Sequence, residues 1–238
     1  MSAHRMRAPR SLKNRAGVWV SDYAYAVRAE RASARERVEP SAFERGSERP
    51  VLLVPGVYET WEYLMPVARA LHEAGHPVFA VPALQRNSIP IPEAARLATT
   101  VLRTRDLSNV VVVAHSKGGL IGKHVMALGD PDHRVAGVVA IATPFHGSTL
   151  SRLPLTRPLR EFAPGRGSIA ALALEKRVNE NIVSIYPQYD THIPSGSELP
   201  GATNIALPLG GHFRVLAEPM VIDEVLRAVR KMPAASGS

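Results

Sequence analysis

The residues with the clearest chemical meaning form one stretch, Asn109-Val-Val-Val-Val-Ala-His-Ser-Lys-Gly-Gly-Leu-Ile-Gly122. An apolar run that predicts a buried strand leads directly into Ser116, and a helical pattern follows at once. Small residues lie two positions before the serine (Ala114) and two positions after it (Gly118). This spacing is typical of a tight strand-to-helix turn that raises a serine hydroxyl above a sheet. We therefore predict that Ser116 is a nucleophile for attack on a carbonyl carbon.

Such an attack needs hydrogen-bond donors for the negative charge that develops on the carbonyl oxygen. The backbone N–H of Lys117 is one candidate, because the first turn of a helix presents unpaired N–H groups. The other candidate is Val57, which follows the predicted strand and Pro-Gly turn of Val51-Leu-Leu-Val-Pro-Gly56. A Pro-Gly pair alone indicates only a turn, but its place before the serine strand favours a role as the second donor.

The proton acceptor and its partner are expected late in the chain. Asp190 lies in a loop after a predicted strand, and His212 follows two glycines after the next strand. The order Ser, Asp, His predicts that Asp190 orients the imidazole of His212, whose other nitrogen takes the proton of Ser116.

Other residues compete for these roles. His115 adjoins the serine and has no easy path to the hydroxyl of its own neighbour, whereas His146 and His192 are loop residues expected near the site. Asp223 and Glu218 are alternatives for the acid, but they lie in or beside the last predicted helix, where we expect them to face solvent. No His, Asp or Glu spacing is typical of a metal site, so we predict neither a metal nor a cofactor.

The elements that must position these residues alternate along the chain. Short apolar runs rich in Val and Ile predict strands buried on both faces, at 51–54, 78–81, 110–114, 135–142, 182–186 and 204–207. Helical patterns lie between or after them, at 66–74, 92–105, 118–128 and 219–231. This alternation predicts an α/β fold with a mostly parallel central sheet flanked by helices.

Two segments depart from the alternation. Residues 1–49 are predicted as a basic N-terminal arm, in which the spacing of Trp19, Tyr23 and Ala26 predicts a helix around 18–37. Residues 148–176 mix proline, glycine, leucine and arginine and are predicted as a short cap inserted between two strands. We therefore divide the chain into the arm, 1–49, and a catalytic domain, 50–238.

Composition and charge narrow the function classes. The 238 residues include no cysteine, which excludes disulfides and cysteine nucleophiles. Of the net charge of +8, residues 1–49 carry +5, and aromatic residues make up only 5% of the chain, so we predict no nucleic-acid partner. No signal peptide or transmembrane segment is expected, which favours a cytoplasmic protein, with peripheral attachment to an anionic membrane surface left open. The sequence does not indicate an oligomeric state.

The span from Pro50 to Lys231 resembles the α/β-hydrolase superfamily and, within it, the small bacterial lipases, esterases and lipid deacylases. The similar pieces are Val54-Pro55-Gly56, Ala114-His-Ser-Lys-Gly-Gly119, Ile141-Ala-Thr-Pro-Phe-His-Gly-Ser148, Asp190-Thr-His-Ile-Pro194 and Gly211-His212. Pro55 departs from the usual His-Gly oxyanion motif, and Ala114 replaces the first glycine of the serine motif.

This resemblance implies Ser116, Asp190 and His212 as a catalytic triad, with Val57 and Lys117 as oxyanion donors. It implies a serine hydrolase that cleaves carboxylic esters through an acyl-enzyme. The leucine, phenylalanine and arginine residues of the predicted cap favour apolar acyl groups. An acyltransferase or thioesterase with the same triad is one alternative, and a non-catalytic binding module on the same fold is another.

Overall fold

The computed structural model describes residues 12–35, 38–148 and 157–235. At its centre lies a six-stranded sheet in the order β2-β1-β3-β4-β5-β6, in which every neighbouring pair is parallel. The strands are β1 (Val51–Val54), β2 (Val78–Phe79), β3 (Val110–His115), β4 (Val135–Ile141), β5 (Ile182–Tyr189) and β6 (Thr203–Gly210). Because the strands run in the same direction, their carboxyl ends meet at one edge, where the loops with the predicted site residues begin.

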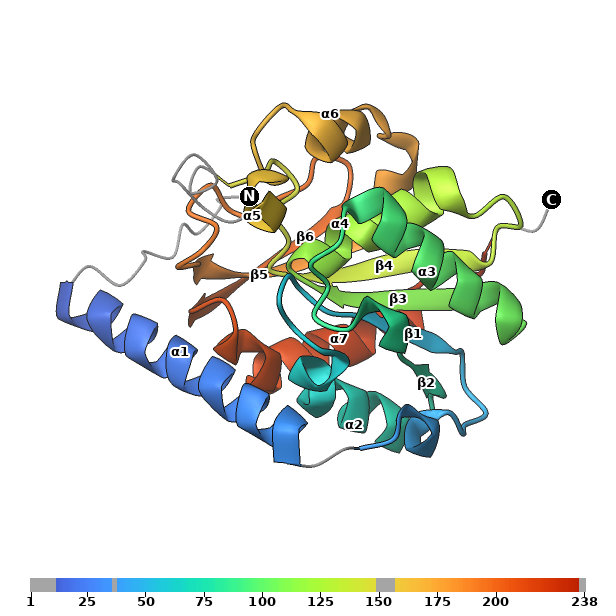
Figure 1. Cartoon of the computed structure of the whole chain (residues 1–238), viewed down its shortest axis with the longest axis horizontal. Coiled ribbons are helices and arrows are strands. Elements are labelled where there is room, and N and C mark those ends of the chain that lie inside the picture. Colours follow the sequence, from blue (N-terminus) through green and yellow to red (C-terminus); the bar gives the residue numbers. More distant parts are fainter. Residues whose placement is uncertain (1–11, 36–37, 149–156, 236–238) are drawn as a thin grey trace, which may run out of the picture.

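Helices cover both faces of this sheet (Figure 1). On one face lie α1 (Leu12–Arg35), α2 (Met65–Glu73) and α7 (Pro219–Lys231). On the other face lie α3 (Ile91–Thr104), α4 (Lys117–His124) and α6 (Gly167–Leu174). The strands alternate accordingly: Leu52 and Val54 pack in the cluster with α3 and α4, whereas Val51 and Leu53 pack in the cluster with α2 and α7. The predicted α/β architecture is confirmed.

Several boundaries differ from the sequence prediction. β5 and β6 continue to Tyr189 and Gly210, through residues such as Pro187, Gln188 and Pro208 that interrupt the apolar runs on which the prediction was based. The helix predicted to reach residue 128 changes after His124 into a π-helical turn, η4 (Val125–Gly129). Short helices in the connections are η1 (Pro40–Phe43), η2 (Trp61–Leu64), η3 (Pro82–Leu84), α5 (Arg157–Arg160), η6 (Arg177–Asn181) and η7 (Arg214–Ala217).

The cap predicted at 148–176 contains α5 and α6, while its residues 149–156 lie outside the described residues. Glu161 joins this segment to the core. One of its carboxylate oxygens accepts a hydrogen bond from the backbone N–H of Ile91 (2.9 Å), and the other lies 3.6 Å from Nζ of Lys117. The cap is therefore tied directly to the helix that follows Ser116.

Residues 1–49 are predicted from the sequence as an arm outside the catalytic domain, but α1 packs directly on that domain. The Tyr25 hydroxyl donates to the backbone oxygen of Tyr63 (3.0 Å), and the Tyr63 hydroxyl donates to Glu30 (3.1 Å). Glu30 also pairs with Arg86. No described helix is both long and apolar enough to cross a lipid bilayer.

Candidate active site

Ser116 occupies a strained turn between β3 and α4, with φ 51° and ψ −119°. The neighbouring glycines show why the turn needs small residues. A side chain at Gly118 would overlap the backbone oxygen of Val54, and one at Gly119 would overlap Thr143. Thr143 in turn donates its hydroxyl to the backbone oxygen of Ser116 (2.9 Å). A positive φ at a non-glycine residue is unfavourable, so the packing around the turn must hold this conformation.

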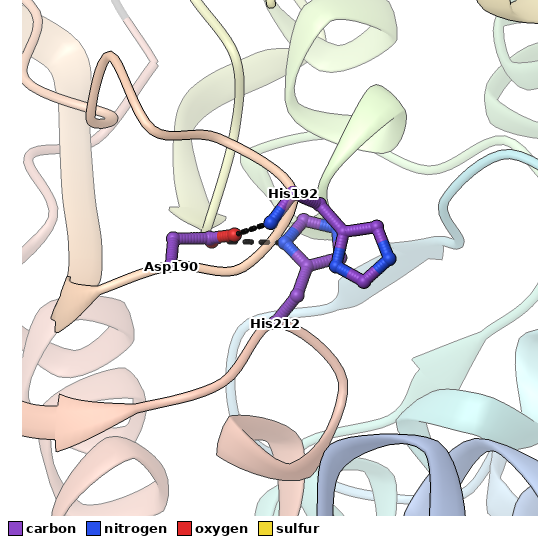
Figure 2. Close-up of side chains that lie close together, drawn as sticks. All are labelled: Asp190, His192 and His212. Atoms are coloured by element: carbon purple, nitrogen blue, oxygen red, sulfur yellow. Dashed lines mark hydrogen bonds and ion pairs between the residues drawn. The ribbon is translucent and has the colours of Figure 1, made fainter. Parts of the chain in front are cut away.

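The structure brings Ser116, His212 and Asp190 together from three separate loops. Nε2 of His212 lies 3.0 Å from Oγ of Ser116, and Nδ1 of His212 lies 2.9 Å from Oδ2 of Asp190 (the latter drawn in Figure 2). All three residues are buried. Because a carboxylate only accepts hydrogen bonds, Nδ1 carries the hydrogen and Nε2 is free to accept the proton of the serine hydroxyl.

The carboxylate of Asp190 is itself fixed by backbone donors. Its Oδ1 accepts hydrogen bonds from the N–H groups of His192 (2.7 Å) and Ile193 (2.9 Å). Burial alone would raise the pKa of Asp190, but the charge and hydrogen bond of His212, with these two N–H groups, lower it below its usual value. For His212 the direction is reversed: burial alone would lower its pKa. The charge and hydrogen bond of the Asp190 carboxylate outweigh the effect of burial, so the pKa of His212 is raised.

The loop after β1 carries the predicted oxyanion donor Val57. The preceding N–H, of Gly56, donates to Glu59 (2.7 Å), and a side chain at Gly56 would overlap that carboxylate. Glu59 also accepts from Nδ1 of His115 (2.8 Å), so this loop is attached to the end of β3. Val57 lines the same cavity as Ser116.

The other predicted donor, Lys117, is the first residue of α4, so its N–H has no acceptor within the helix. Its side chain is fully buried and points away from solvent, with Nζ donating to the backbone oxygens of Asn87 (3.3 Å) and Ile89. Burial lowers the pKa of this ammonium group, and nearby Glu161 opposes the change. The side chain thus joins α4 to the loop before α3.

His115 does not act on the serine hydroxyl but holds the predicted base. Its Nε2 lies 3.0 Å from the backbone oxygen of His212, while Nδ1 faces the Glu59 carboxylate. The ring of His115 therefore connects the carboxylate of the loop after β1 to the backbone of the predicted base. Sequence reasoning missed Glu59, because nothing in Pro-Gly-Val-Tyr-Glu distinguishes its carboxylate from an ordinary loop acid.

Sequence reasoning also missed Asp22 of α1, which is fully buried against the two loops that carry Asp190 and His212. Its Oδ1 accepts backbone hydrogen bonds from His212, Phe213 and Arg214, and its Oδ2 accepts from the hydroxyl of Thr191. A signal was present: Asp22 is an acidic residue within the apolar stripe of the predicted helix.

A cavity of about 420 Å³ opens in front of the serine. Its walls are mainly apolar and come from α1, the loop after β1, the cap, and the two loops that carry Asp190 and His212, here called the late loops. They include Trp19, Tyr23, Val57, Tyr58, Tyr63, Ser116, Leu159, Phe162, His192, Ile193, His212 and Phe213. A larger hollow of about 890 Å³ between α3 and η4 has no contact with Ser116.

The structure shows where the other histidine and acidic residues considered for the base and acid roles lie. His192 lines the site cavity, and its ring centre lies 4.9 Å from that of His212. Burial, with the charge of His212, lowers the pKa of His192 to about 4. His146 and Asp223 are exposed, and Glu218 is paired with Arg214 instead of approaching His212.

Among the described residues, one group of histidine and acid side chains is close enough to consider as a metal site. Ligand atoms of Asp190, His192 and His212 lie within 4.8 Å of one another (Figure 2). However, Oδ2 of Asp190 already bonds Nδ1 of His212, and Nδ1 of His192 bonds Thr191. A metal ligand role would replace the bonds that orient these rings, so the donor set fits a hydrogen-bonded acid–base pair better.

No family model matches the chain, and no curated protein matches it in sequence. Solved structures do match over most of its length. An extracellular α/β-hydrolase from a Paenibacillus species is 17% identical, with a TM-score of 0.54 over 76% of this chain and 99% of its own. The mature lipase BlEst2 of Bacillus licheniformis is 14% identical, with a TM-score of 0.57 over 82% and 94%. Lipase B of Aspergillus fumigatus is 17% identical, with a TM-score of 0.62 over 82% and 55%.

At these identities the likeness is one of fold. The parallel sheet, the serine at the turn between β3 and α4, and the likeness to these structures show that this chain has an α/β-hydrolase fold.

Proposed function

We propose that this protein is a serine hydrolase that cleaves carboxylic esters with apolar acyl groups. The observation that carries the proposal is the continuous hydrogen-bonded line from Ser116 through His212 to Asp190, with heavy-atom distances of 3.0 and 2.9 Å. Lipases and an α/β-hydrolase among the structural neighbours support hydrolysis as the general class of reaction.

In the proposed reaction, Oγ of Ser116 attacks the ester carbonyl carbon while Nε2 of His212 takes the hydroxyl proton. The carbonyl oxygen becomes an oxyanion, for which the backbone N–H groups of Val57 and Lys117 are the proposed donors. When the tetrahedral intermediate collapses, the bond to the alcohol oxygen breaks and His212 returns the proton to that oxygen. A water molecule then repeats the sequence on the acyl-enzyme and releases the carboxylic acid.

The choice of apolar acyl groups rests on the walls of the cavity. Leu159 and Phe162 reach it from the cap, Trp19 and Tyr23 from α1, and Phe213 from the late loop. A cavity of about 420 Å³ is of the size that holds a small organic ligand. We expect an aryl octanoate to be cleaved with a higher kcat/KM than the acetate, and a preference for acetate would contradict this part of the proposal.

Covalent labelling tests the proposal directly. A fluorophosphonate probe should label the folded wild-type protein, and the variant Ser116→Ala should take up no label and hydrolyse no ester. Failure to label the wild type, or labelling that survives in Ser116→Ala, would overturn it. Product analysis with added alcohol separates hydrolysis from acyl transfer, and a parallel thioester series tests the thioesterase alternative.

We also propose that α1 can place the protein on an anionic lipid surface. Trp19, Val20, Tyr23 and Val27 are large apolar residues of α1 that are exposed, and the helix also carries several arginines. An apolar stripe beside positive charge fits the interface of an anionic bilayer.

A further inference from the structure

We propose that Asp22 of the N-terminal helix is a positioning residue that holds both late loops of the active site in register. The proposal rests on the proposed function, in which those loops supply the base His212 and the acid Asp190. Asp22 is separated from His212 by 190 positions in the sequence, yet it is fully buried beside it. A buried carboxylate is stable only when hydrogen bonds or charges compensate for its lost hydration.

The first oxygen of Asp22 fixes the loop of the base. Oδ1 accepts the backbone N–H groups of His212 (2.9 Å), Phe213 (2.7 Å) and Arg214 (2.9 Å). Three consecutive N–H groups converge on one atom, an arrangement that favours an anion at that point. Gly211 has φ 111°, and a side chain there would approach Oδ1 of Asp22 to 2.8 Å. The glycine before the base therefore makes room for this carboxylate.

The second oxygen of Asp22 fixes the loop of the acid. Oδ2 accepts the hydroxyl hydrogen of Thr191 (3.0 Å), so Thr191 can only accept at its other contact, with Nδ1 of His192 (2.9 Å). His192 must then carry its hydrogen on Nδ1, and its Nε2 accepts from the Tyr23 hydroxyl (3.3 Å). The direction of this whole chain of hydrogen bonds follows from the negative charge of Asp22.

The four-point attachment of His212 shows why this matters. Asp22 holds its backbone N–H and His115 its backbone oxygen, while Asp190 and Ser116 hold the two ring nitrogens. Without Asp22, the backbone N–H of His212 loses its acceptor, and the main chain that carries the imidazole ring is held less firmly. A displacement of about 1 Å in a catalytic group can reduce the rate about 10²-fold.

Two substitutions separate the hydrogen bonds of Asp22 from its charge. Asp22→Ala removes every acceptor, and we expect kcat to fall about 10²-fold with KM changed much less. Asp22→Asn keeps one acceptor oxygen for the three backbone N–H groups but replaces Oδ2 by an NH2 group. The Thr191 hydroxyl must then accept from that NH2 and donate to His192, which moves the hydrogen of His192 from Nδ1 to Nε2.

Nitrogen-15 NMR of histidine-labelled protein reads this tautomer without any substrate, in the wild type and in Asp22→Asn. We expect Nδ1–H in the wild type and Nε2–H in the variant. A wild type with Nε2–H, or an unchanged tautomer in Asp22→Asn, would overturn the proposal. If the wild type hydrolyses no ester, the proposed function fails, while this spectrum still tests the position of Asp22.

Two variants serve as controls. Asp223→Asn makes the same chemical change at an exposed position of α7 and should change neither the tautomer nor kcat. Glu30→Gln weakens the attachment of α1 through Tyr63 and Arg86 without touching the late loops. If a folded Asp22→Ala keeps kcat within about threefold of wild type, or if Glu30→Gln reproduces its loss, Asp22 has no specific positioning role.

Discussion

Replacing Asp190 by asparagine tests how the geometry sets the proton position on His212. The two oxygens of Asp190 are not equivalent: Oδ1 accepts two backbone N–H groups, whereas Oδ2 accepts from His212. In Asp190→Asn, the remaining oxygen is held by those backbone donors, so the new NH2 group faces Nδ1 of His212. The imidazole must then accept at Nδ1 and carry its hydrogen on Nε2, where it cannot take the proton of Ser116.

The size of the fall in kcat is set by the free-energy cost of rotating the side-chain amide in Asp190→Asn. To restore the productive tautomer, the amide of Asp190→Asn must rotate and place its NH2 group against the N–H groups of His192 and Ile193. Two buried backbone donors then lose their acceptor, at about 1–3 kcal/mol each. A total of about 2–6 kcal/mol corresponds to a fall of about 30- to 10⁴-fold in kcat.

The assay is ester hydrolysis at saturating substrate, with the rate of fluorophosphonate labelling as a second measure. Thermal unfolding of Asp190→Asn checks that the variant is folded. Because the pKa of Asp190 is lowered in the folded state, the ionised acid stabilises the protein above its ordinary pKa, and the variant loses that contribution at neutral pH. A folded variant whose kcat lies within tenfold of wild type would refute this reasoning.

Further predictions concern the base, the turn and the helix surface. The carboxylate of Asp190 outweighs burial and raises the pKa of His212. Because the base must be neutral to accept a proton, kcat/KM should fall on the acid side with a midpoint above the ordinary histidine value of 6.5. A midpoint below 6.5 would contradict the assigned charges. Gly118→Ala should destabilise the protein by about 1–3 kcal/mol in denaturant unfolding, because its methyl group overlaps the backbone oxygen of Val54, and an unchanged midpoint would contradict this packing. Replacing the exposed Val20 and Val27 by glutamate should weaken salt-sensitive binding to phosphatidylserine vesicles at least tenfold while leaving hydrolysis of a soluble ester unchanged; equal binding would refute the proposed lipid surface.

The amino-acid sequence determined the order and type of the main elements. Continuous valine and isoleucine runs such as Val110–Val113 predicted buried parallel strands, because both faces of such strands are covered by helices. The small residues around Ser116 marked the turn, where a side chain at Gly118 would overlap the backbone oxygen of Val54 and one at Gly119 would overlap Thr143. The order of Ser116, Asp190 and His212 singled out three residues whose side chains the structure places within hydrogen-bonding distance.

Only the tertiary structure decided which other charged groups support them. Asp22 and Glu59 are single acids in a helix and a loop, and their roles depend on contacts with residues far along the chain. The sequence reading set the N-terminal helix apart as a basic arm, since a local pattern reports an apolar stripe but not the surface it covers. Burial of a carboxylate depends on donors brought in from elsewhere, and chain folding alone places the three N–H groups that follow Gly211 around the oxygen of Asp22.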